Sequence, residues 1–315
     1  MGSTSSARAE WALAAVTILW GSSFTLVKQA LDDVSVMLFL TLRFALAGLV
    51  LFTLYRRPLL ADWRETRTGL RGGLWCGLLL TGAYLLQTYG QRYTTPARSG
   101  FLTALNVVMV PILMALVYRT MPRWTEALGA GIALSGTALM TLAVPGQTRG
   151  DWNLGDLLTI GCALLFAVHI VAVGHYVRQN GVFAALSVIQ VLTVAILCGL
   201  AAGAGVEPWL LRPAAAVWVS VALTGLVCTA LAFSVMAWAQ QHTSPSRVAL
   251  IFAMEPISAW LTSYWVLGER LGAPAVAGAA LILMGVGVVE WSPCRNEPNP
   301  PMRDRGDSHG PQRTL

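Results

Sequence analysis

Charged residues are scarce in this chain of 315 residues, and lysine is almost absent. Only 11% of the residues are charged, against about 25% in an average soluble domain. The one lysine, Lys28, follows Val27, whereas a phosphate-binding P-loop requires a lysine directly after a glycine. The sequence therefore excludes a pump that hydrolyses ATP on this polypeptide alone.

Motifs for hydrolysis and for metal binding are also missing. The sequence contains neither H-E-x-x-H nor G-x-S-x-G, which are signatures of zinc proteases and serine hydrolases. Four of the five cysteines lie singly in apolar segments and Cys294 lies near the carboxyl terminus, so their spacing forms neither a metal-ligand pair nor a disulfide pattern. We expect no enzymatic activity, no cofactor and no metal site.

Apolar residues, by contrast, make up 56% of the chain. They gather into ten segments whose lengths are close to the roughly 20 residues that a helix needs to cross a bilayer. The sequence therefore predicts an all-α, polytopic membrane protein with ten transmembrane helices. The predicted spans are residues 11–29, 35–55, 72–91, 97–118, 125–144, 154–176, 182–204, 214–239, 246–267 and 272–291.

The formal net charge of +6 would suggest nucleic-acid binding in a soluble protein, but its placement indicates a membrane topology. With a cytoplasmic amino terminus, fourteen basic residues fall in cytoplasmic loops and tails, six fall in outer loops, and Arg43 falls within a span. Positive charge concentrates on the cytoplasmic side of membrane proteins. We therefore expect both termini in the cytoplasm and no nucleic-acid partner.

An internal repeat runs through the chain at a fixed offset of 149 residues. It links four residues around the turn before the fourth predicted span and two glycines in the fifth. The pairs are Gln91 with Gln240, Thr94 with Thr243, Pro96 with Pro245, Arg98 with Arg247, Gly129 with Gly278, and Gly136 with Gly285. Such a repeat in an apolar chain is typical of a duplicated membrane unit, and such units usually build transporters.

Ten spans divide into two copies of five, and an odd number of spans makes the second copy enter the membrane from the opposite side. The halves are then related by a pseudo-two-fold axis in the membrane plane. The predicted parts are a cytoplasmic amino terminus (1–10), a first repeat (11–144), a linker loop (145–153), a second repeat (154–291) and a disordered cytoplasmic tail (292–315).

Polar residues within spans tend to face a cavity or a partner, because burying them in lipid is costly. Tyr84, Gln87 and Gln91 share one helix face, and their repeat partners do the same. Together with aromatic neighbours, these residues predict a midplane site that is largely apolar. The candidate substrate-binding residues are Trp20, Ser23, Tyr84, Gln87, Gln91 and Asn106 in the first half, and Phe166, His169, Phe233, Met236, Gln240 and Ser258 in the second.

Each candidate also has an interpretation that involves no ligand. The aromatic residues would simply pack between helices. His169 would donate a hydrogen bond to a backbone carbonyl. The glutamines and Asn106 would form interhelical hydrogen bonds.

Glu255, the repeat partner of Asn106, is the only carboxylate deep within a predicted span. A buried carboxylate either pairs with a cation or takes up a proton. The available deep cation is Arg43, so a static Arg43–Glu255 ion pair is one interpretation. The other is that Glu255 gains and loses a proton as the two halves move, which would couple proton entry to substrate exit.

Helix starts and prolines give two further expectations. Thr95 and Ser244 each precede a proline and are suited to cap the helices that follow. These caps either only mark the helix ends or attract anions at the two mouths. Pro111 and Pro256 favour kinks in the fourth and ninth spans; they are not repeat partners, so we expect the kinks to differ.

Several motifs resemble the EamA-type members of the drug/metabolite transporter superfamily. They are Trp20-Gly21-Ser22-Ser23-Phe24, Leu42-Arg43-Phe44, Glu255-Pro256 and Leu267-Gly268-Glu269-Arg270-Leu271. The resemblance covers residues 10–291. It implies two inverted five-helix repeats, a bacterial inner membrane location, and transport of small organic solutes through a cavity lined by helices 1, 3, 4, 6, 8 and 9. The family's Gly-Glu motif matches Gly268-Glu269, whereas the first half has Arg119-Thr120 at the equivalent place.

The expected function is secondary transport by alternating access, with helices 1–4 and 6–9 forming two rocking bundles. Export of an amino acid or amine-like metabolite in exchange for protons is preferred on the resemblance. The alternatives are a facilitator without ion coupling and a membrane scaffold that transports nothing. The expected partners are a small-molecule substrate, the lipid bilayer and protons, and the protein is expected to be a monomer or a homodimer.

Overall fold

The computed structural model describes residues 2–61, 63–94, 96–119, 121, 123–142, 152–180, 182–267 and 272–290, and the regular elements within these ranges are all helical. The helices are α1 (Gly2–Ala30), α2 (Val36–Ala61), α3 (Trp63–Tyr93), α4 (Pro96–Thr103), α5 (Asn106–Tyr118), α6 (Trp124–Leu142), α7 (Leu154–Asn180), α8 (Phe183–Gly203), α9 (Ala215–Gly225), the π-helix η1 (Leu226–Leu231), α10 (Ala232–Ala239), α11 (Pro245–Phe252), α12 (Glu255–Leu267) and α13 (Ala273–Glu290).

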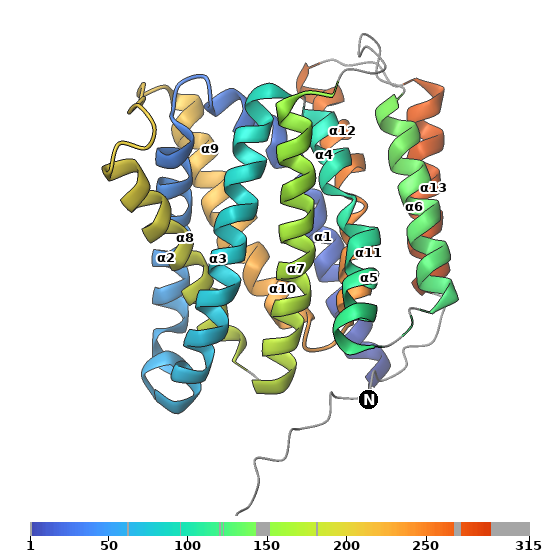
Figure 1. The fold of residues 1–315 in the computed structure, drawn as a ribbon, viewed down its shortest axis with the longest axis horizontal. Helices are drawn as coiled ribbons and strands as arrows, with labels where there is room; N and C mark the ends of the chain where they lie inside the picture. Colours follow the sequence, from blue (N-terminus) through green and yellow to red (C-terminus); the bar gives the residue numbers. More distant parts are fainter. Residues whose placement is uncertain are drawn as a thin grey trace, which may run out of the picture.

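These elements make ten passes through the molecule, which confirms the predicted ten-helix fold. Three of the passes are interrupted: α4 continues into α5, α9 continues through η1 into α10, and α11 continues into α12 (Figure 1). Six segments of the described chain are long and apolar enough to cross a bilayer on length and composition alone. They are Ser5–Ala30, Val36–Ala61, Arg98–Tyr118, Leu154–Arg178, Phe183–Gly203 and Ala215–Ala239.

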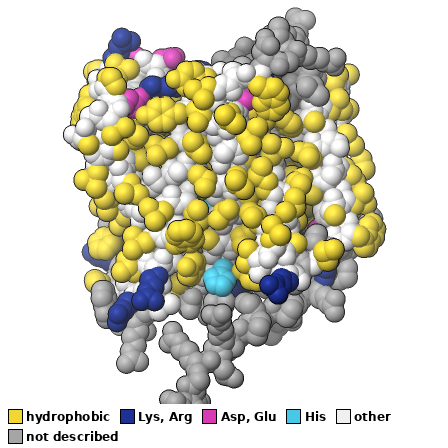
Figure 2. Space-filling view, viewed as in Figure 1, with side chains coloured by type: hydrophobic (Ala, Val, Ile, Leu, Met, Phe, Trp, Pro, Cys, Tyr) yellow, Lys and Arg dark blue, Asp and Glu magenta, His cyan; other side chains and the backbone are white. Residues whose placement is uncertain are grey.

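The outer surface is suited to lipid. Large apolar side chains are exposed on the outside of the helices, among them Leu49 and Leu54 on α2 and Ile196 on α8. Figure 2 shows hydrophobic side chains over the middle of one face, with Lys and Arg gathered towards its two ends. Exposed leucine and isoleucine are favourable in a bilayer, and the charges at the ends match its polar boundaries.

The two halves run in opposite directions. Helices α1 and α7, the first helices of the halves, start at opposite ends of the molecule, and α13 ends at the end where α1 begins (Figure 1). We call the end where α1 begins the amino-terminal face and the other end the opposite face. This arrangement is the inverted repeat that the odd number of spans predicts.

The pair α6 and α13 packs backbone against backbone through repeat-related glycines. A Cβ atom added to Gly136 would lie 2.5 Å from the carbonyl oxygen of Gly278, and one added to Gly129 would lie 2.7 Å from that of Gly285. Gly129 corresponds to Gly278, and Gly136 to Gly285, in the repeat. The two contacts are therefore exchanged by the pseudo-two-fold axis, which passes between α6 and α13.

The interruptions in the fourth and ninth passes fall at equivalent positions, so the expectation of different kinks is wrong. Helix α5 begins at Asn106 and α12 begins at Glu255, and these residues are repeat partners. Pro111 lies inside α5, whereas Pro256 lies at the second position of α12. The break therefore comes from the shared fold of the repeat, and the prolines do not set its place.

Several predictions concern helix ends. Ser244 caps α11 as expected, because its side chain accepts a hydrogen bond from the backbone N–H of Arg247 at 3.3 Å. Thr95, the Gly268-Glu269 motif, most of the predicted linker and the predicted tail at 292–315 lie outside the described residues. Helix α1 begins at Gly2, so helical structure extends into the segment predicted as the amino terminus.

The glycine contact between α6 and α13 gives a prediction with an internal control. Replacing Gly136 with alanine should destabilise the purified protein by about 1–3 kcal/mol, because the new methyl group must displace backbone atoms. Gly131 lies on the same helix with nothing within 4 Å of an added Cβ, so Gly131→Ala should preserve or raise stability. Thermal unfolding in detergent measures both, and equal melting temperatures would contradict the packing described.

Candidate functional site

A cavity lies between the two halves and draws its walls from both. Its lining comes from α1, α3, α4, α5, α7, α10, α11 and α12, with one residue from α2. The lining residues are Trp20, Ser23, Phe24, Val27, Arg43, Tyr84, Gln87, Thr88, Gln91, Thr103, Asn106, Phe166, His169, Ile170, Phe233, Met236, Phe252 and Glu255.

Twelve of the fourteen residues predicted from the sequence line this cavity, and Gln240 and Ser258 do not. Gln240 is the C-cap of α10 and is fully buried. The Ser258 hydroxyl donates to the carbonyls of Thr17 at 3.3 Å and Glu255 at 3.0 Å, so it serves the packing of α12 on α1. We therefore assign neither residue a place in the site.

The lining also includes residues that polarity and repeat matching did not select. Phe24, Val27, Thr88 and Ile170 follow the candidates Trp20, Ser23, Tyr84 and Phe166 by four residues, and Thr103 and Phe252 precede Asn106 and Glu255 by three. Residues three or four apart lie on the same helix face. A search for neighbours one turn from each candidate would therefore have found all six.

Aromatic rings form one wall of the cavity around Phe233. The ring of Trp20 lies 5.5 Å from that of Phe233 and 4.9 Å from that of Phe252. The ring of Tyr84 lies 5.5 Å from that of Phe166 and 6.3 Å from that of Phe233. Tilted and edge-on contacts at such distances are favourable, so the rings pack on one another while they line the cavity.

Arg43 is held by neutral groups rather than by a carboxylate. Its Nε donates to Thr229 Oγ1 at 2.8 Å, and its Nη2 donates to the Tyr84 hydroxyl at 3.3 Å. Its guanidinium also lies 4.8 Å from the centre of the Tyr84 ring, a cation–π distance. Within the described residues, Arg43 forms no ion pair with Glu255 or with any other acidic side chain.

The partner of Arg43 comes from the π-helix η1. Thr229 lies in η1 and donates its hydroxyl to the Thr224 carbonyl at 2.8 Å, which leaves its oxygen free to accept from Arg43. The Cys228 carbonyl in the same turn accepts a hydrogen bond from Trp20 Nε1 at 2.5 Å. Single π-turns often mark functional sites, and this one fixes both an arginine and a tryptophan of the cavity.

Asn106 and Glu255 occupy equivalent places at the start of α5 and α12. The positive end of a helix dipole favours a carboxylate, so α12 supports the charge of Glu255. Glu255 is only 8% exposed and forms no ion pair with the basic residues that the structure describes. The cavity therefore holds one cationic and one acidic side chain that do not neutralise each other.

Several polar atoms of cavity-lining residues have no hydrogen-bond partner within the part of the chain that the structure describes. They include Asn106 Oδ1, Gln91 Oε1 and His169 Nδ1. The other ring nitrogen of His169, Nε2, lies 2.9 Å from Gln190 Oε1, so the histidine contacts a side chain and not the expected backbone carbonyl. Unpaired buried polar atoms are costly, so the residues that line the cavity carry unused hydrogen-bonding capacity.

Comparison with known proteins identifies the family. Residues 7–142 and 153–291 each match the sequence model of the EamA-like transporter family. The chain belongs to this family. An EamA-like protein with this fold is a multi-pass membrane transporter. The helices that line the cavity between its two EamA repeats are those that the resemblance indicated, with Arg43 of α2 in addition.

Relatives of this EamA-like transporter span nearly its whole length. An uncharacterized transporter of Archaeoglobus fulgidus is 31% identical over 281 residues, which cover 89% of this chain and 85% of the relative. A probable terminal-alkyne amino-acid exporter of Streptantibioticus cattleyicolor is 25% identical and covers 89% of this chain and 92% of its own. A crystal structure with 21% identity superposes with a TM-score of 0.71 over 90% of this chain and 98% of its own, which supports the fold.

The Thr229–Arg43 hydrogen bond predicts a loss of stability on substitution. In Thr229→Val the side chain keeps its shape but loses the oxygen that accepts from Arg43 Nε. A buried charged donor without its partner costs about 1–3 kcal/mol, so the melting temperature of the purified protein should fall. Thr229→Ser keeps the oxygen and should stay close to the unmodified protein. Equal losses in both variants would mean that packing, not the hydrogen bond, matters.

Proposed function

We propose that this transporter exports a small amino acid or amine-like metabolite by alternating access, in exchange for protons. The observation that carries the proposal is the presence of Arg43 and Glu255 in one cavity without an ion pair between them. A zwitterion offers a carboxylate to the first and an ammonium group to the second.

The surroundings of the two charges support this substrate class. Arg43 is held by Thr229 and Tyr84, so its guanidinium keeps its position whether or not a carboxylate is bound. Glu255 is the repeat partner of Asn106, whose Oδ1 has no hydrogen-bond partner among the described residues. The side-chain oxygens of both residues accept hydrogen bonds, so together they suit an ammonium donor. The aromatic wall between the two repeats suits an apolar side chain.

Two further arguments support export. The relative from Streptantibioticus cattleyicolor is named as a probable amino-acid exporter. The distribution of Lys and Arg in the sequence favours cytoplasmic termini, and we propose a bacterial inner membrane location on the family resemblance. In this orientation the amino-terminal face is the cytoplasmic entrance.

Glu255 is our candidate for proton coupling. When the cavity opens outward, the carboxylate takes up a proton and releases the ammonium group of the substrate. When the cavity opens to the cytoplasm, it loses the proton and is ready for the next substrate. Proton and substrate thus compete for one acidic group, which is the simplest arrangement for exchange.

Binding can be tested with matched ligands. A thermal-shift screen of the purified protein should show stabilisation by at least one amino acid, about 2.7 kcal/mol at a ligand concentration of 100 Kd. The methyl ester of that amino acid lacks the carboxylate, and its N-acetyl derivative lacks the ammonium group. Each should stabilise much less. A ligand set in which only amines stabilise would restrict the substrate class to amines, and a lack of stabilisation by all would contradict the proposal.

Coupling can be tested with Glu255→Gln in proteoliposomes. Flux of the identified ligand driven by a pH gradient should be lost, because glutamine cannot exchange a proton, while the melting temperature of the purified protein should stay close to that of the unmodified protein. Glu126→Gln, a change on α6 outside the cavity lining, should keep gradient-driven flux. If the unmodified protein ignores the gradient, the protein is a facilitator; if it carries no flux, the scaffold alternative holds.

A further inference from the structure

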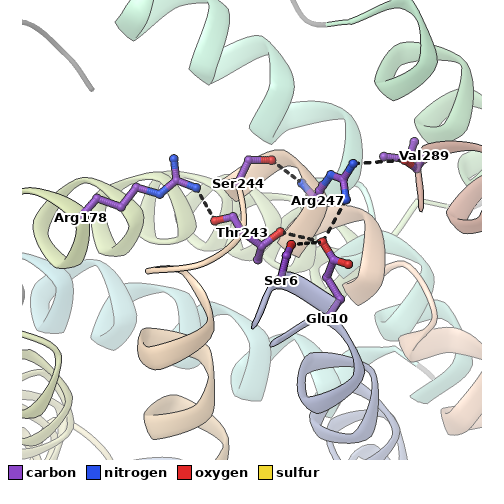
Figure 3. Close-up of polar contacts among 7 residues, drawn as sticks. All are labelled: Ser6, Glu10, Arg178, Thr243, Ser244, Arg247 and Val289. Atoms are coloured by element: carbon purple, nitrogen blue, oxygen red, sulfur yellow. Dashed lines mark hydrogen bonds and ion pairs between the residues drawn. The ribbon is translucent and has the colours of Figure 1, made fainter. Parts of the chain in front are cut away.

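A buried polar cluster joins the two halves near the start of α1 (Figure 3). Oε1 of Glu10 on α1 accepts hydrogen bonds from Thr243 Oγ1 at 3.1 Å and from Arg247 Nη1 at 3.0 Å. Ser6 on the previous turn donates to the same oxygen at 3.0 Å. Glu10 belongs to the first repeat, and Thr243 and Arg247 belong to the second, so the cluster joins the halves.

The opposite face carries a cluster of the same composition. Asp156 on α7 accepts a hydrogen bond from Thr94 Oγ1 at 3.0 Å and pairs with Arg98 Nη2 at 2.7 Å. Here the carboxylate belongs to the second repeat, and the threonine and arginine belong to the first. Asp156 is fully buried.

The repeat relates the two clusters residue by residue. Thr94 and Arg98 correspond to Thr243 and Arg247 at the offset of 149 residues, and Glu10 corresponds to Asp156 at 146 residues. The second offset is the one that matches Trp20 with Phe166 and Ser23 with His169 in the same helices. The pseudo-two-fold axis therefore exchanges one cluster for the other.

A second pair of cations ties each turn to its own half. Lys28 on α1 donates to the backbone carbonyls of Gln91 and Thr94. Arg178 on α7 donates to the carbonyl of Gln240 at 3.0 Å and to that of Thr243. Gln240 and Thr243 are the repeat partners of Gln91 and Thr94. Each turn is thus fixed to its own half by a cation and joined to the other half by a carboxylate.

We infer that these clusters are the two gates of the transporter. The amino-terminal gate is Glu10 with Thr243 and Arg247, and the opposite gate is Asp156 with Thr94 and Arg98. Opening either face separates a carboxylate on one half from the arginine and threonine on the other, while the Lys28 and Arg178 contacts move with their halves and stay intact. This inference rests on the proposed alternating access and adds residues that hold each face closed. At the opposite face, the Arg92–Glu207 pair at 2.9 Å and the Asp33–Arg212 pair at 3.5 Å also join the halves.

Each gate closes through charge-assisted contacts, and at the opposite face the backbone of Gly90 and Thr94 also packs directly against Gly155. Charge-assisted hydrogen bonds depend strongly on distance, and removing one partner of a buried ion pair leaves the other charge unsatisfied. Weakening one gate therefore favours the state that is open on that face. Because one rocking motion opens one face and closes the other, the accessibility of the cavity from the other face must fall.

The test measures access to the cavity from each face. Ser23→Cys, at the cavity lining, serves as the reporter in a chain whose five native cysteines are replaced by alanine. A membrane-impermeant thiol reagent is added to right-side-out and to inverted vesicles, and a protease site at the amino terminus assigns the faces. Glu10→Gln should raise the labelling rate through the amino-terminal face several-fold and lower it through the other. Asp156→Asn should do the reverse.

Milder and matched variants keep the test decisive if a charge change impairs folding. Thr243→Val and Thr94→Val remove one hydrogen bond from each gate without changing charge, and they should shift labelling in the same directions by a smaller factor. Glu126→Gln on α6 and Asp32→Asn, an exposed residue in the turn after α1, are control carboxylates. Both should leave the two labelling rates unchanged.

Labelling needs no substrate, so its outcome is separate from that of the proposed function. Opposite shifts in the two gate variants support the inference even if no amino acid binds. Shifts toward the same face, or no shift beyond the controls, would overturn it. If an amino acid stabilises the protein but the gate variants do not change the labelling rates, the substrate proposal is supported and the gate inference is overturned.

Discussion

Polar groups inside a bilayer must find partners within the protein, and in this fold that requirement falls on the interface between two inverted repeats. Lipid accepts no hydrogen bonds, so each polar side chain that faces inward must be satisfied by the other half, by its own half or by a ligand. The two ends of the interface meet the first condition through Glu10 and Asp156. In the middle, Asn106 Oδ1 and His169 Nδ1 have no partner among the described residues, and that is where we place the ligand.

The symmetric and the asymmetric parts of the molecule have different roles. The contacts that define shape, such as those between α6 and α13, obey the repeat closely. In the cavity, positions that correspond in the repeat carry different residues. Asn106 corresponds to Glu255, and Ser23 corresponds to His169. The π-helix occurs in the second half, and the matching part of α3 is α-helical. A symmetric framework therefore carries an asymmetric site, which is what binding a substrate with two different ends requires.

The sequence predicts most of this site because duplication places equivalent residues at equivalent depths. Gln240 shows where the argument fails. Gln91 lies within α3, whereas Gln240 follows the end of α10, so the same position in the repeat turns away from the cavity. The partner of Arg43 was also beyond prediction, because Thr229 lies 186 residues away and a π-turn leaves no recognisable periodicity. The gates could have been found from the sequence by extending the offset of 146 residues to Glu10.

The reciprocal glycine contacts between α6 and α13 set a limit on how far the two halves can differ. Gly129 meets the partner of Gly136, and Gly136 meets the partner of Gly129, which is the pattern of an isologous contact between two identical subunits. Each contact therefore takes one glycine from each repeat, and a larger residue at either copy would push the two helices apart. The cavity places no such demand on its two walls, as the pair of Asn106 and Glu255 shows.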